Sequence, residues 1–286
     1  MVRKAVIPMA GLGTRLGPLA RVISKGMFPL ADEAGVVRPV MHTIAAEAVA
    51  AGIEQLALIV SPDHAATVRR YVEVLAETAQ GDLARRVEII IQDRPGGLGQ
   101  AALCAADFVG DEAFMLLLGD HVCRQDPSRP RCAAQALRAF EATGGSAMVA
   151  VQVVGPAELH RVGVARGEPV AEDIYRCTEI IEKPDVETAR ARLATPRLPD
   201  DSFLAHFGIY VFGPEIFDCL SDRVVRTPAG KETGLTEAQQ ELLRRAPGGY
   251  FLVRIAGQAY DIGTPAGYVA AQAALSKRRE DASGRL

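Results

Sequence analysis

The residues best suited to chemistry come early, where an apolar segment at 4–9 runs into Ala10-Gly11-Leu12-Gly13-Thr14-Arg15. Glycines let main-chain N–H groups approach an anion closely, because no Cβ stands in the way. Arg15 adds a planar guanidinium group and the nearby Lys25 a compact ammonium group, and groups of both kinds bind phosphate oxygens. The pattern predicts a strand followed by a phosphate-binding loop, although two glycines after a strand are also typical of a plain structural turn.

Two common phosphate-binding loops do not fit this segment. A Walker A loop needs Gly-Lys followed by Ser or Thr, and that sequence occurs nowhere in the chain. The dinucleotide-binding fingerprint needs a third glycine three residues after Gly13, where the chain has Leu16, and Gly17 comes one position late. If the loop binds phosphate, it does so in another class of protein.

Polar residues beside other apolar segments form a second set of candidates. Asp120 follows one such segment and Asp261 precedes the last helical pattern; taken alone, Asp120 is equally a turn residue and Asp261 a helix cap. Gln92 leads into a glycine-rich segment, which alone is read as a simple helix entry. Glu182 and Lys183 end another apolar segment, and such a pair is commonplace on protein surfaces.

Several of these segments, in this order, carry a resemblance to a known family. They are the glycine loop with Lys25, Gln92 to Gln100, Leu118-Gly119-Asp120, Glu182-Lys183-Pro184, Phe207 to Phe212 and Tyr260-Asp261-Ile262-Gly263. Together they resemble the sugar-1-phosphate nucleotidyltransferases (nucleoside-diphosphate-sugar pyrophosphorylases), and look most like the bacterial UTP–glucose-1-phosphate uridylyltransferases. The resemblance covers the chain from Lys4 to about Gln272.

The resemblance implies that a nucleotidyl group passes from an NTP to a sugar 1-phosphate and that pyrophosphate leaves, with Mg²⁺ as the cofactor. The substrates expected are UTP and α-D-glucose 1-phosphate, and the product is UDP-glucose. The attacking phosphate monoester has a second pKa of about 6, so it is already ionised and needs no strong protein base. The tasks left to the protein are positioning and neutralisation of charge.

The resemblance also assigns roles to individual residues. The implied nucleotide-binding residues are Ala10, Gly11, Leu12, Gly13, Thr14, Arg15, Gln92, Gly97 and Asp120. The implied sugar-binding residues are Gly163, Glu182, Lys183 and Gly208, and the implied catalytic cations are Arg15, Lys25 and Lys183. Asp120 and Asp261 are expected to share one Mg²⁺, an ion that prefers oxygen ligands and retains several waters. Gln100 is a weaker candidate beside Gln92.

Some residues depart from the family pattern. Gly26 and Phe28 stand where the family usually has Glu and Leu, the segment 32–39 is longer than usual, and Glu237 stands where the family has Asp. These departures leave other partners open, namely dTTP, ATP, or a different sugar or cyclitol phosphate. A protein of another class, a non-catalytic regulator that binds sugar nucleotides, is a further alternative.

Three neighbouring residues receive structural roles at this stage. His121, beside Asp120, is expected to form a wall or to bind water, because the mechanism requires no acid or base. Tyr210 is expected to pack in the core, and Thr236 to cap a helix.

Composition and charge exclude several classes of function. The chain has 286 residues, of which 49% are hydrophobic and 23% charged, which is ordinary for a globular protein. A net charge of −3 gives no support for general binding to nucleic acid or to an acidic membrane. Five scattered cysteines without a C-x-x-C pattern favour reduced thiols in a cytoplasmic protein. We expect no cleavable signal and no transmembrane segment.

Alternating patterns in the first half predict an α/β fold. Strands are expected at 4–9, 55–60, 87–92, 113–118 and 146–153, with helices near 40–51, 64–79, 99–107 and 130–142. This alternation is typical of a Rossmann-like, mostly parallel mixed sheet flanked by helices. The second helix is expected to begin at Ser61-Pro62-Asp63, with a polar cap and a proline in its first turn.

In the second half the strand and helix patterns no longer alternate regularly, which predicts a smaller α+β portion that binds the sugar phosphate. Strands are expected at 162–165, 175–182, 203–212 and 250–255, with helices near 186–194, 214–220, 235–245 and 264–278. We expect a nucleotide-binding portion at 1–154 and a sugar-phosphate-binding portion at 155–286, within one continuous domain. The charged run at 277–281 is typical of a solvated helix end. The resemblance also implies a homo-oligomer, either a dimer or a tetramer.

Overall fold

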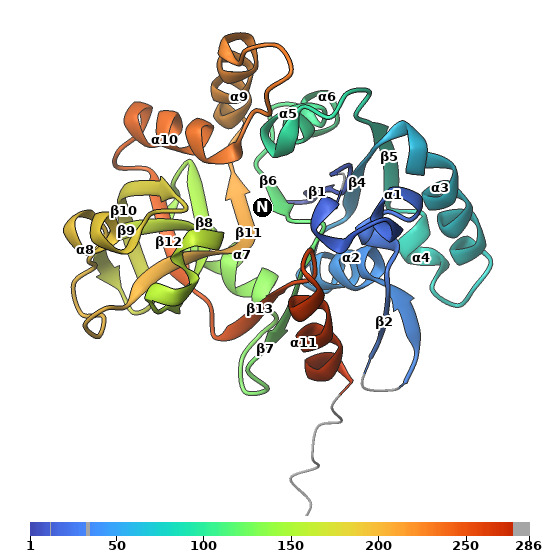
Figure 1. The fold of residues 1–286 in the computed structure, drawn as a ribbon, viewed down its shortest axis with the longest axis horizontal. Coiled ribbons are helices and arrows are strands. Elements are labelled where there is room, and N and C mark those ends of the chain that lie inside the picture. Colours follow the sequence, from blue (N-terminus) through green and yellow to red (C-terminus); the bar gives the residue numbers. More distant parts are fainter. Residues whose placement is uncertain (12, 33–34, 277–286) are drawn as a thin grey trace, which may run out of the picture.

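The structure, a computed structural model, describes residues 1–11, 13–32 and 35–276. Its centre is a nine-stranded mixed sheet in the order β5-β4-β1-β6-β11-β8-β12-β10-β9. The strands of this sheet are β1 (Lys4–Pro8), β4 (Gln55–Val60), β5 (Val87–Ile91), β6 (Phe114–Leu117), β8 (Ala147–Val154), β9 (Gly163–Ala171), β10 (Ile174–Glu182), β11 (Phe203–Phe212) and β12 (Tyr250–Arg254). Strands β5, β4, β1 and β6 are parallel, and helices flank the sheet (Figure 1), so the predicted α/β class is confirmed.

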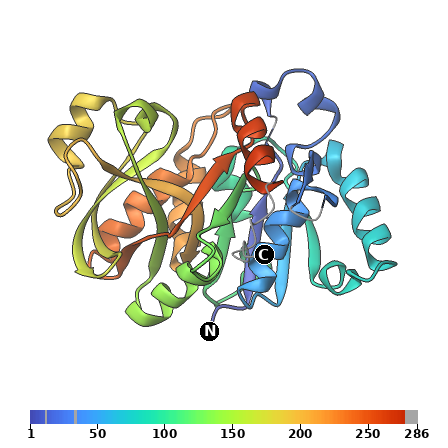
Figure 2. The same ribbon diagram turned by 90° about the horizontal axis from the view of Figure 1, so that it is seen from below.

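Two layers of helices enclose the sheet (Figures 1 and 2). One layer packs on the larger core cluster and comprises α2 (Val40–Ala50), α3 (Pro62–Ala76), α7 (Cys132–Thr143) and α11 (Pro265–Leu275). The opposite layer comprises α5 (Gly97–Leu103), α6 (Ala106–Val109), α9 (Glu215–Arg226) and α10 (Leu235–Arg245). The shorter elements are α1 (Leu19–Val22), α4 (Gly81–Ala84), α8 (Val186–Arg192) and the 3-10 turns η1 (Thr14–Leu16), η2 (Lys25–Met27) and η3 (Pro156–Arg161).

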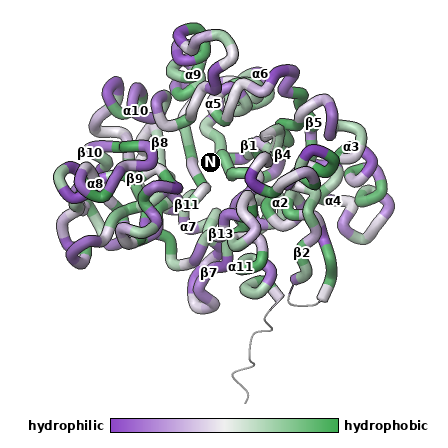
Figure 3. Tube along the Cα trace, in the orientation of Figure 1, coloured by the Kyte–Doolittle hydropathy of each residue, from purple (hydrophilic) through white to green (hydrophobic). Residues whose placement is uncertain are grey.

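Hydrophobic residues concentrate along the central strands, and hydrophilic residues on the outer helices and turns (Figure 3). β11 shows the reason most clearly, because it lies between β6 and β8 and all ten of its residues are buried. A strand covered by helices on both faces has no solvated side, so its sequence is apolar at successive positions. Each large apolar side chain buried in this way contributes roughly 1.5–3 kcal/mol.

The long elements follow the sequence-based predictions closely. The strands predicted at 55–60 and 203–212 and the helix at 235–245 coincide with β4, β11 and α10. The pattern near 99–107 forms two helices, α5 and α6, instead of one, and the helix predicted at 214–220 continues to Arg226. The charged run at 277–281 lies outside the described residues.

One predicted cap is wrong in its detail. Helix α3 begins at Pro62 after Ser61, as expected, but the Ser61 side chain caps no main-chain N–H. Its Oγ instead lies 3.0 Å from Nδ1 of His64. A side-chain partner one turn along the helix has displaced the usual capping contact.

Sequence analysis does not predict two short strand pairs, and one of them is decisive for the site. These pairs are β2 (Pro29–Ala31) with β3 (Val37–Pro39), and β7 (His121–Gln125) with β13 (Gly257–Asp261). The antiparallel register of β7 and β13 places Asp261 opposite His121. Figure 2 shows β13 running through the middle of the molecule into α11. Short strands of mixed polarity carry little local signal, and this pairing joins distant segments.

The main sheet takes strands from both predicted portions of the chain. β11, from the second portion, forms ladders with β6 and β8 of the first. The sheet is therefore continuous between the two portions, and their division into a nucleotide-binding and a sugar-phosphate-binding part near residue 154 stays a prediction. Among the described residues, no helix combines the length and apolar character needed to cross a bilayer.

Gly208 provides a test of the β11 backbone. Between His206 and Tyr210 the register of β11 with β8 shifts, and Gly208 has a φ of +94° there. A Cβ at Gly208 would lie 3.0–3.1 Å from atoms of the His121 side chain. We expect Gly208→Ala to lower the free energy of unfolding by about 1–3 kcal/mol, because alanine disfavours this backbone region and would crowd the ring. Urea denaturation measures the change.

Gly155→Ala is the matched control for that substitution. Gly155 has a φ of −89°, and an added Cβ would meet nothing within 4 Å. We expect its effect to stay below about 0.5 kcal/mol. Equal effects of the two substitutions would contradict the proposed strain at Gly208.

Candidate active site

A cavity of about 550 Å³ opens at the carboxyl ends of β1 and β6, next to the starts of β9 and α10. In open α/β sheets this is the edge at which ligands bind. Ten predicted site residues line it: Ala10, Gly11, Arg15, Lys25, Gln92, Gly97, Asp120, Gly163, Glu182 and Lys183. Four others lie outside this lining, namely Gly13, Thr14, Gly208 and Asp261. Leu12 lies outside the described residues.

Gly13 supports the site from behind the loop. It has a φ of +62°, and a Cβ there would lie 2.8 Å from Cβ of Ala20 and 3.0 Å from Cγ of Lys25. A residue without a side chain therefore lets the aliphatic stem of Lys25 cross the loop. The Lys25 ammonium group is brought to the cavity in this way.

Asp120 is held as an anion by two neighbours. Lys25 Nζ donates to its Oδ2 at 2.5 Å, and His121 Nδ1 lies 3.0 Å from its Oδ1. Burial opposes ionisation of Asp120, but the hydrogen bond and charge of His121, and then those of Lys25, hold the pKa of the carboxyl well below its usual range. Burial likewise opposes protonation of His121, but Asp120 and then Asp261 raise the pKa of its imidazole.

Asp261 joins this group through main-chain pairing. Ile262 N donates to the carbonyl oxygen of Asp120 at 2.9 Å, just beyond the end of β13. As a result, ligand atoms of Asp120, His121 and Asp261 all lie within 4.8 Å of one another. Arg15 Nη1 approaches Asp261 Oδ2 at 3.5 Å. The structure therefore brings together the two carboxylates that were predicted to share a cation.

The donor set at this point fits Mg²⁺. Two carboxylates offer hard oxygen ligands, and Mg²⁺ commonly binds through one or two of them while keeping several waters. Gly263 keeps the space open, because a Cβ there would lie 3.2 Å from Asp120 Oδ2 and 3.3 Å from Arg15 Nη2. The alternative that Asp261 caps α11 is wrong, since Thr264 caps that helix by accepting a main-chain N–H at 3.1 Å.

Gln92 is buried at another wall of the cavity, beside the glycine-rich turn. Its amide nitrogen donates to the Gly97 carbonyl at 3.3 Å and to Oε1 of Gln100. Gly97 has a φ of +85°, and a Cβ there would lie 2.8 Å from the Thr233 carbonyl oxygen. The turn is both the entry of α5 and a fixed support for the Gln92 amide, so the two interpretations of this segment coexist.

The predicted sugar-binding pair lies where β10 ends. Glu182 Oε2 accepts a hydrogen bond from Thr236 Oγ1 at 2.7 Å, while Oε1 lies 3.5 Å from Lys183 Nζ. The prediction that Thr236 caps α10 is wrong, because the cap position belongs to Gly234 and the Thr236 hydroxyl holds Glu182 instead. Lys183 has a φ of +47°, an uncommon conformation for a residue with a side chain and one that recurs at functional sites.

Among the cavity-wall residues to which sequence analysis gave no role are Arg161, His206 and Gln239. Arg161 is an exposed cation beside the sugar-binding pair. His206 is buried in β11, and a signal for it was present, because it is the one imidazole in an otherwise apolar run. Gln239 is buried in α10 and donates to Tyr250 Oη at 3.0 Å. Nothing in the polar pattern of that helix singled it out.

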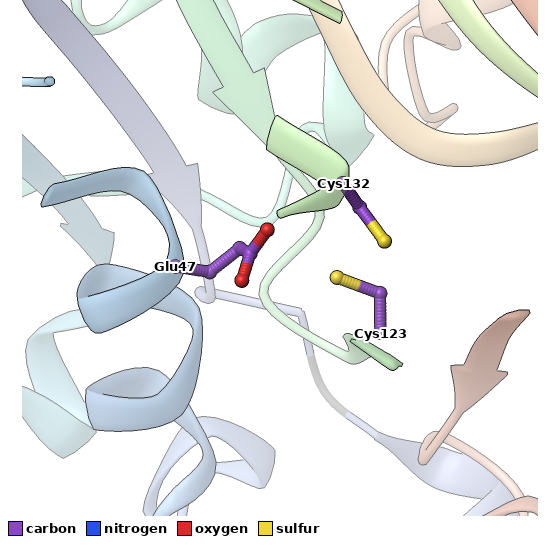
Figure 4. Close-up of side chains that lie close together, drawn as sticks. All are labelled: Glu47, Cys123 and Cys132. Carbon is purple, nitrogen blue, oxygen red and sulfur yellow. The ribbon is translucent and has the colours of Figure 1, made fainter. Parts of the chain in front are cut away.

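A second cluster of possible metal ligands lies away from this cavity and consists of Glu47, Cys123 and Cys132 (Figure 4). Glu47 accepts hydrogen bonds from Ala133 N at 2.9 Å and Arg131 Nη1 at 3.1 Å, so it anchors the start of α7 to α2. The hydrogen bond with Cys132, and then burial, raise the pKa of the Cys123 thiol well above its usual value. Because the Cys123 thiol stays protonated and the Glu47 carboxylate already accepts two hydrogen bonds, this cluster serves to pack α7 against α2 and not to bind a metal ion.

Comparisons with known proteins agree with this geometry. The nucleotidyl transferase family model matches residues 4–278. UTP–glucose-1-phosphate uridylyltransferase 1 of Staphylococcus saprophyticus is 31% identical, covering 94% of this chain and 90% of its own length. UTP–glucose-1-phosphate uridylyltransferase of Bacillus subtilis is 33% identical, with 94% and 89% covered. A solved UDP-glucose pyrophosphorylase complexed with UDP-glucose matches with a TM-score of 0.81 and 26% identity, covering 98% of this chain and 100% of that one.

The burial of His206 predicts a pH dependence of stability. Burial lowers the pKa of its imidazole to about 4, so between pH 6.5 and 4 the unfolded chain binds the proton and the folded chain does not. Above pH 6.5 the imidazole is neutral in both states and does not affect the free energy of unfolding. As the pH falls from 6.5 toward 4, protonation of His206 in the unfolded chain lowers the free energy of unfolding by roughly 3 kcal/mol. His206→Phe should remove that part of the loss, measured by urea denaturation at several pH values. Parallel stability curves for the two proteins would contradict it.

Proposed function

The chain belongs to the nucleotidyl transferase family, and on that premise we propose that it transfers a uridylyl group from UTP to α-D-glucose 1-phosphate. The products are UDP-glucose and pyrophosphate. The observation that carries the proposal is the meeting of two cations, Arg15 and Lys25, with the carboxylates of Asp120 and Asp261 beside one cavity. The names of the similar proteins supply the choice of UTP and glucose 1-phosphate.

The reaction is an in-line displacement at the α-phosphorus of UTP. A phosphate oxygen of the sugar phosphate forms the new bond to that phosphorus, and the bond to the bridging oxygen of pyrophosphate breaks. The attacking group is already an anion, so the protein has to bring two anions together and to stabilise the departing charge. Arg15 is assigned to the leaving pyrophosphate, Lys25 to the α-phosphate and Lys183 to the phosphate of the sugar.

Asp120 and Asp261 are the residues that would hold Mg²⁺. When bound, the ion supplies positive charge to phosphate oxygens without a proton transfer. His121 lines the cavity, as expected of a wall residue. Its Nδ1 contact also keeps Asp120 in place and ionised, which was not expected.

The two ends of the cavity suit a base and a sugar. Gln92 and the main chain at Gly97 are assigned to the pyrimidine, because a fixed amide can match its donor and acceptor edge. Gly163 and Glu182 are assigned to the sugar. Gly208, which was expected to bind the sugar, is assigned to neither the base nor the sugar, because it lies against His121 and outside the cavity lining.

We also assign the reaction to the cytoplasm. All five cysteines are free, as expected for a reducing compartment. Assembly into a dimer or tetramer stays a prediction.

Pyrophosphate release decides between the candidate functions. The purified protein is incubated with Mg²⁺, each of UTP, dTTP and ATP, and a panel of sugar 1-phosphates. We expect the highest kcat/KM with UTP and glucose 1-phosphate. A higher value with another pair would reassign the substrates, and binding of UDP-glucose without any turnover would point to a regulatory protein.

The two cations at the glycine loop provide a direct mutational test. Arg15→Ala and Lys25→Ala should each lower kcat by roughly 10²-fold or more, because each removes charge stabilisation in the transition state. Arg21→Ala is the matched control, since Arg21 is an exposed arginine of α1 outside the cavity lining. Near-normal turnover in the first two variants would refute their assignment.

Asp261→Asn tests the metal site. The substitution keeps the shape of the side chain and removes its charge, so about 10-fold more Mg²⁺ should be needed for half-maximal turnover. Binding of Mn²⁺, followed by electron paramagnetic resonance, should weaken in parallel. Asp126→Asn, at an exposed carboxylate that bonds only to Ser128 among the described contacts, is the control. An unchanged metal titration for Asp261→Asn would remove it from the site.

A further inference from the structure

His206, Gly163 and Glu182 lie side by side on three neighbouring strands. In the pairing of β11 with β9, Leu204 is opposite Ala165 and Ala205 is opposite Val164, so His206 comes next, opposite Gly163. In the pairing of β9 with β10, Gly163 is opposite Glu182. Gly163 therefore separates the two polar residues, and all three line the cavity.

The missing side chain of Gly163 leaves a space that both polar residues face. A Cβ at Gly163 would lie 2.9 Å from His206 Nδ1 and 3.1 Å from Glu182 Oε2. Because both atoms lie about 3 Å from one point, they are close enough for one ligand oxygen, resting in contact with the glycine backbone, to reach the imidazole and the carboxylate together.

His206 lacks the partner that the other buried histidines have. His42 Nδ1 lies 2.9 Å from Tyr71 Oη, and His64 Nδ1 lies 3.0 Å from Ser61 Oγ. His206 is 7% exposed, its Nε2 is buried without a partner, and no described residue forms a hydrogen bond with its Nδ1. Nδ1 is the ring atom that faces the cavity beside Gly163, so a ligand group there can supply the partner that the protein does not.

The surroundings fix both groups and select the kind of ligand. Tyr210, buried as predicted, packs edge to face on the His206 ring at a centroid distance of 5.7 Å, and Thr236 holds Glu182 Oε2. The carboxylate of Glu182 presents Oε2 to this space, and its negative charge disfavours a phosphate group there. Lys183 approaches the other oxygen of the carboxylate, Oε1. A hydroxyl group fits, because it donates its one proton to the carboxylate and accepts a second hydrogen bond from Nδ1–H of the imidazole.

We propose that His206 is a specificity-determining residue that, together with Glu182, binds one ring hydroxyl group of the sugar 1-phosphate in the space above Gly163. The proposal rests on the function given above and refines it: the second substrate is a pyranose phosphate that carries a hydroxyl group at this corner. An analogue without that hydroxyl group leaves the buried His206 imidazole without this partner and is disfavoured.

Kinetics with single-deoxy analogues of glucose 1-phosphate test the proposal in two variants, His206→Val and His206→Asn. For wild-type protein we expect one deoxy analogue to be disfavoured far more than the others. His206→Val should lower kcat/KM for glucose 1-phosphate by about 10- to 100-fold, and the KM for UTP should change by less than about 2-fold. The penalty for that one analogue should shrink in His206→Val, and His206→Asn, which keeps a polar group, should restore part of the selectivity.

His64→Val is the matched control. His64 is also buried with an unpartnered Nε2, but it belongs to α3 and lies outside the cavity lining. Thermal unfolding of both valine variants identifies any general loss of structure. A selectivity change of the same size in His64→Val, or unchanged selectivity in a folded His206→Val, would overturn the proposal.

Calorimetric titration separates failure of this proposal from failure of the proposed function. UDP-glucose and UDP are titrated into wild-type protein and into His206→Val without turnover. If the wild-type protein forms no pyrophosphate with any sugar phosphate, the proposed function fails, and the titration still reports on His206. A weaker affinity for UDP-glucose but not for UDP in the variant supports the contact with the sugar, and equal loss or no loss refutes it.

Discussion

The active site depends on one electrostatic constraint, which is that Asp120 and Asp261 must stand close together beside anionic substrates. Their oxygens approach within 4.8 Å, and two such charges without a cation between them would repel by roughly 3–4 kcal/mol in a protein environment. In this structure Lys25 contacts one carboxylate and Arg15 the other. A divalent ion held by the two carboxylates would release both cations for phosphate oxygens. In its absence these ion pairs stabilise the site and keep the charges of Arg15 and Lys25 in position.

Main-chain hydrogen bonds, not side-chain attraction, enforce this meeting. The short ladder of β7 with β13 sets the register, and the hydrogen bond from Ile262 N to the Asp120 carbonyl extends it by one step. Long side chains alone would adjust and relieve the repulsion. A backbone ladder removes that freedom, and Gly263 and Gly208 then leave room for the crowded side chains around His121.

The sequence predicted the long apolar strands and the charged residues of the site, because both carry local signals. β4 and β11 are largely apolar runs, Lys183 directly follows β10, and Asp120 comes three residues after β6. It could not predict β7 and β13, whose pairing depends on distant segments. It also misassigned Thr236, because a threonine near a helix start usually caps the helix. Only the packing of α10 on β10 shows that its hydroxyl serves Glu182 instead.

The cavity divides its physical tasks between its two sides. The glycine-loop side, built by the first part of the chain, presents Arg15 and Lys25 in ion pairs, and its contacts are strong but carry little information about molecular shape. The side formed by β9, β10 and β11 holds Glu182 beside an uncharged His206, and both are oriented by neutral contacts with Thr236 and Tyr210. Charge can bind any phosphate, whereas a buried polar group such as His206 penalises a ring that leaves it without a partner. Under the proposed function we therefore expect the rate to depend on the first side and the choice of sugar on the second.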